Sequence, residues 1–185
     1  MSNPIKEYAK LRNSTLASLR NVQLPPGELL PLPLPVGTGA ESDIEIEVAL
    51  PTEAPLFIGM QLLASRSARL ATGRAALLTL NFSKPAANGT RQGNVTLTVP
   101  RMATVAGAAG VHTAPLVLRA VEKTVDVRIL VDRSIVEVFA AGGRAVIATR
   151  DYPEKEETAM RLWSEDGRML LPRVDVWSMD CGWAA

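Results

Sequence analysis

The sequence has few of the residues from which enzyme and metal sites are usually built. It contains one cysteine, Cys181, and one histidine, His112, in 185 residues. An internal disulfide is therefore excluded, and we expect no protein-ligated metal. Aromatic residues make up 4% of the chain, which leaves few rings to stack on a ligand. A net charge of +1 provides no field that would attract nucleic acid or an anionic membrane.

Long hydrophobic runs are also absent. The longest nearly apolar stretch, Pro55 to Ala64, is about half of the roughly 20 residues that a spanning helix needs. The N-terminus does not read as a signal peptide, so we expect a soluble chain with neither membrane nor nucleic acid as partner. The hydrophobic content of 47% is enough for one sizeable core, which predicts one domain.

Alternation of apolar and polar residues is the main positive signal. Ile44, Ile46 and Val48 share one face of an extended segment, and the acidic residues between them, at positions 43, 45 and 47, share the other. This pattern predicts a strand with one buried face and one wet, acidic face.

Similar strand patterns recur along the rest of the chain, separated by turn clusters and without crossover helices. They predict an all-β fold, a two-sheet antiparallel β-sandwich of the lectin-like jelly-roll kind. The expected strands are Leu56–Ala64, Ala75–Phe82, Asn94–Val99, Ala114–Ala120, Thr124–Val131, Ile135–Ala140, Arg144–Arg150, Thr158–Trp163 and Met169–Met179. Gly142-Gly143 reads as a hairpin loop and not as a phosphate cradle, because no helix follows it.

The N-terminal part has a different character. Pro4 to Arg20 carries loosely helical spacing, and Leu24 to Val36 is punctuated by prolines that favour an edge strand. We therefore expect residues 1–22 to be a short helical linker segment and residues 23–185 to form the sandwich domain.

One long segment carries a family resemblance. "VDRSIVEVFAAGGRAVIATRDYP", residues 131–153, resembles the signature hairpin in the C-terminal β-sandwich of glycoside hydrolase family 32, and most resembles that of plant-type acid invertases. Other pieces follow in the family's order: "NPIKEYAKLR", "DIEIEVAL", "FIGMQLLA", "HTAPL" and "VDVWSM". The resemblance covers nearly the whole chain.

The resemblance implies an accessory role. In that family a five-bladed propeller precedes the sandwich and holds the catalytic residues, in an Asn-Asp-Pro motif, an Arg-Asp-Pro motif and a glutamate beside a cysteine. None of these motifs occurs here: Tyr152 follows Arg150-Asp151, and Cys181 follows Asp180. We therefore expect no catalytic, cofactor-binding or metal-binding residue in this chain, and no cofactor.

Two carboxylates in the hairpin could imitate a catalytic pair. A retaining glycosidase needs two carboxyl groups about 5 to 5.5 Å apart. Asp132 opens a turn and Glu137 lies in mid-strand, so we expect that the two do not share a pocket. Asp132 would satisfy turn amides, and Glu137 would face solvent or pair with a basic residue.

Sugar-binding modules use exposed aromatic rings. Trp163 and Trp177 lie in alternating strand patterns, so we expect both to be buried. Tyr152 and Trp183 remain as candidates for contact with a glycan.

Four asparagines fit the acceptor pattern for N-glycosylation: Asn13, Asn81, Asn88 and Asn94. They favour a parent protein that passes through the secretory pathway. Asn81 is the weakest of the four because it lies within a predicted strand.

Three hypotheses follow. The first is a non-catalytic module that stabilises a propeller or extends its cleft, with Ile5, Tyr8 and Leu11 facing that partner domain. Without the propeller, the exposed apolar patch would favour self-association. The second is a free-standing lectin-like module that binds carbohydrate, and the third is that the chain itself hydrolyses a glycoside. The first predicts that sequence encoded upstream of Met1 specifies a propeller.

Overall fold

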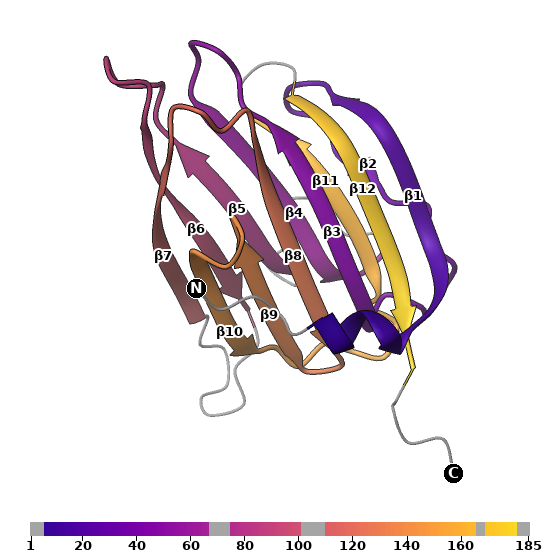
Figure 1. Cartoon of the computed structure of the whole chain (residues 1–185). Coiled ribbons are helices and arrows are strands. Elements are labelled where there is room, and N and C mark those ends of the chain that lie inside the picture. The colour runs from indigo at the N-terminus through magenta and orange to yellow at the C-terminus, as the bar shows by residue number, and fades with distance from the viewer. Residues whose placement is uncertain (1–5, 67–74, 101–109, 166–168, 181–185) are drawn as a thin grey trace.

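The molecule is a sandwich of two six-stranded β-sheets (Figure 1). The computed structural model describes residues 6–66, 75–100, 110–165 and 169–180. Its elements are η1 (Lys6–Leu11), β1 (Arg12–Leu24), β2 (Leu30–Pro31), β3 (Glu41–Ala49), β4 (Leu56–Ala64), β5 (Ala76–Phe82), β6 (Arg91–Val99), β7 (Gly110–Leu118), β8 (Thr124–Asp132), β9 (Ile135–Ala140), β10 (Ala145–Arg150), β11 (Ala159–Ser164) and β12 (Met169–Met179). The predicted antiparallel sandwich is confirmed.

Each sheet combines strands that are distant in sequence. Sheet A has the order β1-β12-β3-β8-β9-β10, and sheet B has the order β2-β11-β4-β5-β6-β7. All the paired strands in both sheets run antiparallel. β12 therefore lies between β1 and β3, and it joins the start of the described chain to the rest of sheet A.

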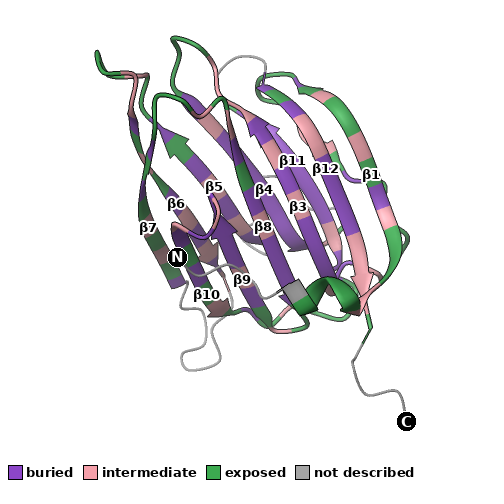
Figure 2. Cartoon of the chain, viewed as in Figure 1, coloured by how far each residue is buried: buried purple, intermediate pink, exposed green. Residues whose placement is uncertain are grey.

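The core lies between the inner faces of the two sheets. Ile44 and Ile129 of sheet A and Phe82 and Leu97 of sheet B are fully buried there, as expected from period-2 alternation. Buried and more exposed positions alternate along most strands (Figure 2). Within the described residues, no helix is long and apolar enough to cross a membrane.

The N-terminal prediction was wrong over half of its length. Among the described residues of this segment, only Lys6–Leu11 is helical, as a 3-10 helix, and strand β1 replaces the expected helix from Arg12 onward. β1 pairs with β12 from Arg12↔Met179 to Leu24↔Met169. Pairing with β12 gives the backbone N–H and C=O groups of β1 their hydrogen-bond partners, which in a helix would come from the same segment. The expected boundary between residues 22 and 23 falls inside β1.

The proline-rich segment is an edge, as predicted, but a short one. Only Leu30–Pro31 forms β2, which pairs with β11 at the border of sheet B. Leu32 and Leu34 follow it and are buried, so irregular backbone also contributes to the core.

The signature segment contains the end of β8 and all of β9 and β10, and these three strands form a meander at the other border of sheet A. Asp132 pairs with Ile135, so Arg133 and Ser134 are the turn residues, and Arg133 has a positive φ of 52°. In the loop between β9 and β10, Gly142 and Gly143 have φ values of 65° and 75°. The predicted hairpin chemistry of these two glycines is confirmed.

Candidate functional site

The outer face of sheet A carries charged residues that were expected to be solvated. Asp43 of β3 is fully buried, so the prediction of a wet acidic face was wrong at this position. Its carboxylate accepts hydrogen bonds from Arg12 Nε (2.7 Å), Arg128 Nε (2.9 Å) and Arg128 Nη2 (2.7 Å). Two guanidinium groups offset the cost of removing this carboxylate from water.

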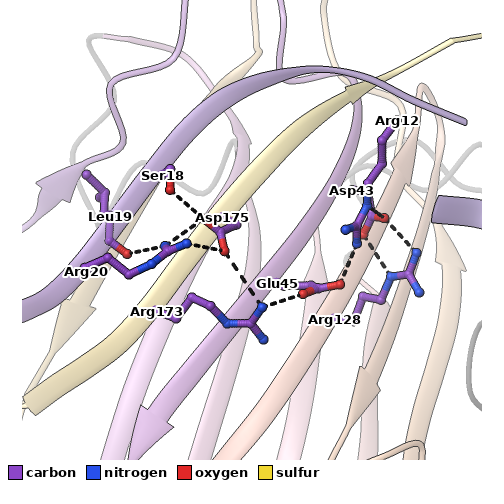
Figure 3. A network of polar contacts seen from close by, with 9 residues as sticks. All are labelled: Arg12, Ser18, Leu19, Arg20, Asp43, Glu45, Arg128, Arg173 and Asp175. Atoms are coloured by element: carbon purple, nitrogen blue, oxygen red, sulfur yellow. Dashed lines mark hydrogen bonds and ion pairs between the residues drawn. The ribbon is translucent and has the colours of Figure 1, made fainter. Parts of the chain in front are cut away.

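The ion-pair network spans four strands, β1, β12, β3 and β8 (Figure 3). Glu45 accepts hydrogen bonds from Arg12 and Arg173. Asp175 of β12 accepts from Arg20 Nη1 (2.7 Å) and from Ser18 Oγ (2.8 Å) on β1. Burial alone would raise the pKa of Asp175, but these hydrogen bonds and the nearby guanidinium charges lower it below its ordinary value.

Arg12 fixes the junction between η1 and β1. Its guanidinium contacts both Asp43 and Glu45 and lies over the Trp177 ring, 3.6 Å from the centroid. Burial alone would lower the pKa of Arg12, but the hydrogen bonds to the two carboxylates raise it above its ordinary value. Charge pairing and the cation–π contact together set the position from which η1 leaves the sheet.

A hollow of about 500 Å³ lies beside η1, and we call it the η1 hollow. Tyr8 and Leu11 of η1 contribute to its lining, together with Leu130 and Ile135 of sheet A. Tyr8 is 36% exposed and Ile135 is 38% exposed, whereas Leu130 is buried. Ile5, the third residue predicted to face a partner domain, lies outside the described residues.

Asp132 and Glu137 both line the η1 hollow, so the expectation that they do not share a pocket was wrong. Asp132 pairs with Ile135, two residues before Glu137. Asp132 and Glu137 are therefore diagonal neighbours on one face of the sheet. Such diagonal positions on two paired strands are about 7–8 Å apart. Glu41 also lines the hollow and accepts from Arg133 Nε at 2.6 Å. In the described part of the chain, no group of three His, Cys, Asp or Glu residues could hold a metal ion.

A second hollow of about 710 Å³ adjoins the first, and we call it the Tyr152 hollow. Both hollows are lined by Glu41, Arg133, Met179 and Asp180. Tyr152 is 41% exposed and lines the second hollow, where a ligand could reach its ring. Trp183, the other candidate for glycan contact, lies outside the described residues.

The four candidate glycosylation residues are all exposed. Asn13 donates to Asp180 Oδ1 (3.0 Å), and Asn88 accepts from the backbone and hydroxyl of Thr90. Asn81 and Asn94 stand opposite each other on β5 and β6. Their use as acceptors remains a prediction.

Other conspicuous residues have structural surroundings. His112 Nε2 lies 2.9 Å from Thr149 Oγ1, and the backbone N–H of the buried Asp151 donates to Ser134. Trp163 is buried as predicted, whereas Trp177 is half-buried beneath Arg12. Cys181 lies outside the described residues.

Sequence reasoning missed the ion-pair network because its partners come from four strands. A usable signal was present: Arg128, Arg173 and Asp175 alternate with apolar residues in β8 and β12, as Asp43 and Glu45 do in β3. Opposite charges at alternating positions of separate strands favour cross-strand pairing.

Comparison with known proteins shows one family. The family model described as "Glycosyl hydrolases family 32 C terminal" matches residues 7–178. An acid beta-fructofuranosidase from Solanum lycopersicum is 46% identical over 57 residues, which cover 29% of this chain and 9% of that protein. A sucrose-6-phosphate hydrolase from Escherichia coli is 38% identical over 52 residues, which cover 28% of this chain and 11% of that protein.

Solved structures share the fold. The fructan 1-exohydrolase IIa from Cichorium intybus matches with a TM-score of 0.78 and 19% identity, over 96% of this chain and 37% of that chain. An exo-inulinase from Aspergillus awamori matches with a TM-score of 0.73 and 20% identity, over 98% of this chain and 32% of that chain. The chain thus spans about a third of these two enzymes.

Proposed function

Because the chain belongs to the family of glycosyl hydrolase family 32 C-terminal domains, we propose that it is the non-catalytic β-sandwich of an invertase-like glycoside hydrolase. In this role it stabilises a propeller-type catalytic domain or extends its cleft. The observation that carries the proposal is the family match over residues 7–178. Arg12, which pairs with Asp43 and Glu45, sets the position from which η1 leaves sheet A.

The docking surface in this proposal is the η1 hollow and its rim. Tyr8, Leu11 and Ile135 provide partly exposed apolar surface around it, and Glu41 and Arg133 form a polar pair at its edge. An apolar centre with a polar rim is typical of protein interfaces. The ion-pair network adjoins this surface through Arg12, which directly follows Leu11.

The chemistry of the parent protein is proposed from its relatives. The names of the similar proteins describe enzymes that act on fructosides, such as beta-fructofuranosidase and fructan 1-exohydrolase. In this proposal another domain supplies the nucleophile, the acid/base and the transition-state stabiliser. Asp132 and Glu137 then serve the docking surface and are not a catalytic pair.

The first experiment reads the coding sequence upstream of Met1. A propeller with Asn-Asp-Pro and Arg-Asp-Pro motifs, intact or decayed, is the expected result. An unrelated upstream gene would remove the support for an accessory role and favour a free-standing glycan-binding module.

The second experiment tests the docking surface directly. The chain is co-expressed with that propeller, and the melting temperature of the complex is compared for Leu11→Ala and for Val111→Ala. Val111 is 65% exposed on β7 of sheet B and provides the matched control. Loss of complex stability in Leu11→Ala alone supports the proposal, and equal effects of the two changes oppose it.

Self-association offers a test that needs no second domain. We expect the isolated chain to form dimers or larger species at high concentration, because the docking surface is uncovered. Light scattering measures this, and Leu11→Glu should restore the monomer. A strict monomer in the unchanged chain would argue for an autonomous module.

A further inference from the structure

We propose that the Tyr152 hollow is a binding site for a neutral oligosaccharide. Such a site goes beyond the accessory role proposed above. It rests on that role only for the choice of a fructosyl oligosaccharide as the first probe. The argument comes from the shape of the hollow, its balance of charge and the exposed ring at its rim.

The size of the hollow fits a small ligand. Its volume of about 710 Å³ lies within the range of about 300 to 1,000 Å³ that is usual for ligand pockets. Five segments form its walls: the start of β1, the loop that leads into β3, the turn between β8 and β9, the loop between β10 and β11, and the end of β12. Segments far apart in sequence converge here, as in many binding sites.

The walls are held together before any ligand arrives. The backbone N–H of Arg133 donates to Ala40 O (2.7 Å), and that of Asp151 donates to Ser134 O (2.9 Å). Gly39 lies so close to Thr158 that a Cβ at position 39 would stand 2.0 Å from the Thr158 carbonyl oxygen. A preformed site loses little conformational entropy when a ligand binds.

The loop that presents Tyr152 is likewise ordered by its own hydrogen bonds. The buried Glu157 accepts from the Glu154 backbone N–H (2.8 Å) and donates its own N–H to Glu154 O (2.9 Å). This reciprocal pair closes the turn after Pro153. Tyr152 therefore lies between two hydrogen-bonded points, Asp151 on one side and the Glu154–Glu157 turn on the other.

The charges around the hollow nearly cancel. Arg133 and Lys155 provide two positive charges, and Glu41, Glu154 and Asp180 provide three negative charges. A site for phosphate or another anion would carry an excess of positive charge. Balanced carboxylate and guanidinium groups instead suit the paired hydroxyls of a neutral sugar, which both donate and accept hydrogen bonds.

The ring of Tyr152 provides the apolar contact that such a ligand needs. One face of a sugar ring presents C–H groups, which pack on aromatic faces, and a tyrosine has an apolar body with a polar tip. At 41% exposure the ring is accessible at the hollow that the polar groups line.

The turn between β8 and β9 determines where the Arg133 side chain lies in the hollow. Arg133 has a φ of 52°, a left-handed conformation that is unfavourable for a residue with a long side chain. Here the turn places the Arg133 guanidinium beside Glu41, at the border between the two hollows.

Selective labelling of tyrosine gives a direct test, because the chain contains only two tyrosines. NMR spectra of the ¹³C-tyrosine-labelled full chain are recorded during titration with 1-kestose, maltotriose, xylotriose and inorganic phosphate. We expect at least one of the sugars to shift the Tyr152 ring signals progressively and to leave those of Tyr8 in place. Phosphate should shift neither.

Two variants locate the binding energy. Tyr152→Ala should weaken the sugar's affinity about tenfold or more, as truncation of a central aromatic contact does, whereas Tyr152→Phe keeps the ring and should bind within about threefold of the unchanged chain. Val121→Ala, 81% exposed and away from the hollow, is the control and should bind normally.

Several results would overturn the inference: no shift at Tyr152 with any of the sugars, a shift with phosphate only, or unchanged affinity in Tyr152→Ala. None of these results contradicts the accessory role if the propeller still binds through the η1 hollow. Conversely, sugar binding at Tyr152 without propeller binding would refute the accessory role and retain this site.

Discussion

The buried carboxylate of Asp43 offers the sharpest test of how the outer face of sheet A is stabilised. We consider Asp43→Asn, which keeps the shape of the side chain and removes its charge. Asp43 now accepts three hydrogen bonds from two guanidinium groups. Asparagine offers one oxygen, and its NH2 group would face N–H donors that it cannot accept from.

The cost can be estimated from these contacts. Removal of one partner from a buried ion pair destabilises proteins by about 3–5 kcal/mol. The side chains of Arg12 and Arg128 are 19% and 17% exposed, so water partly solvates them after the change. We therefore expect about 3 kcal/mol, which lowers the melting temperature of a domain of this size by about 6–12 °C.

Urea unfolding followed by tryptophan fluorescence measures this loss. The control is Glu47→Gln, on the same strand and the same face, where a change within about 0.5 kcal/mol is expected. A double-mutant cycle with Arg128→Met isolates the coupling between the two charges. If Asp43→Asn and Glu47→Gln cost the same, the view that paired charges stabilise this face is wrong.

Three further predictions concern acid, catalysis and packing. Because the pKa of Asp175 is lowered in the folded chain, its ionised carboxylate stabilises the fold above the ordinary pKa of 3.8, and this stabilisation is lost as the pH falls below that value. The urea midpoint should therefore drop in that acid range, and it should drop less steeply in Arg20→Gln. Identical pH profiles for the two chains would contradict this. The purified chain should release no reducing sugar from sucrose, inulin or levan, and turnover abolished by Asp132→Asn or Glu137→Gln would refute the non-catalytic role. Gly59→Ala should cost about 1–3 kcal/mol in urea unfolding, because the new Cβ would stand 2.1 Å from the buried Trp163 ring; an unchanged unfolding midpoint would show that the ring can move aside.

The strands in which apolar and polar residues alternate could be predicted from the sequence. Met169–Met179 was predicted with the bounds that the structure has, because apolar and polar residues alternate through most of it. β1 could not be predicted in this way, since its identity as a strand depends on pairing with residues more than a hundred positions away. Local periodicity reports which face is apolar and does not identify the pairing partner.

The site residues also divide into those that local sequence identifies and those that depend on distant partners. Tyr152 was predicted as a contact residue from its type alone, and the structure places it at a hollow. The burial of Asp43 was missed because its two arginines lie 31 and 85 residues away. The shared hollow of Asp132 and Glu137 was missed because the argument followed the chain and neglected diagonal neighbours across the hairpin.

The position of β12 between β1 and β3 determines when this domain can fold. Until residues 169–179 have been synthesised, β1 has no neighbour in sheet A, and the charged face of β3 lacks the strand that carries Asp175 and Arg173. Folding on the ribosome must therefore wait for nearly the whole domain, and pairing over such sequence distances is slow. During that interval the waiting strands are open to wrong partners, so synthesis of this sandwich should depend on chaperones more than its final stability would indicate.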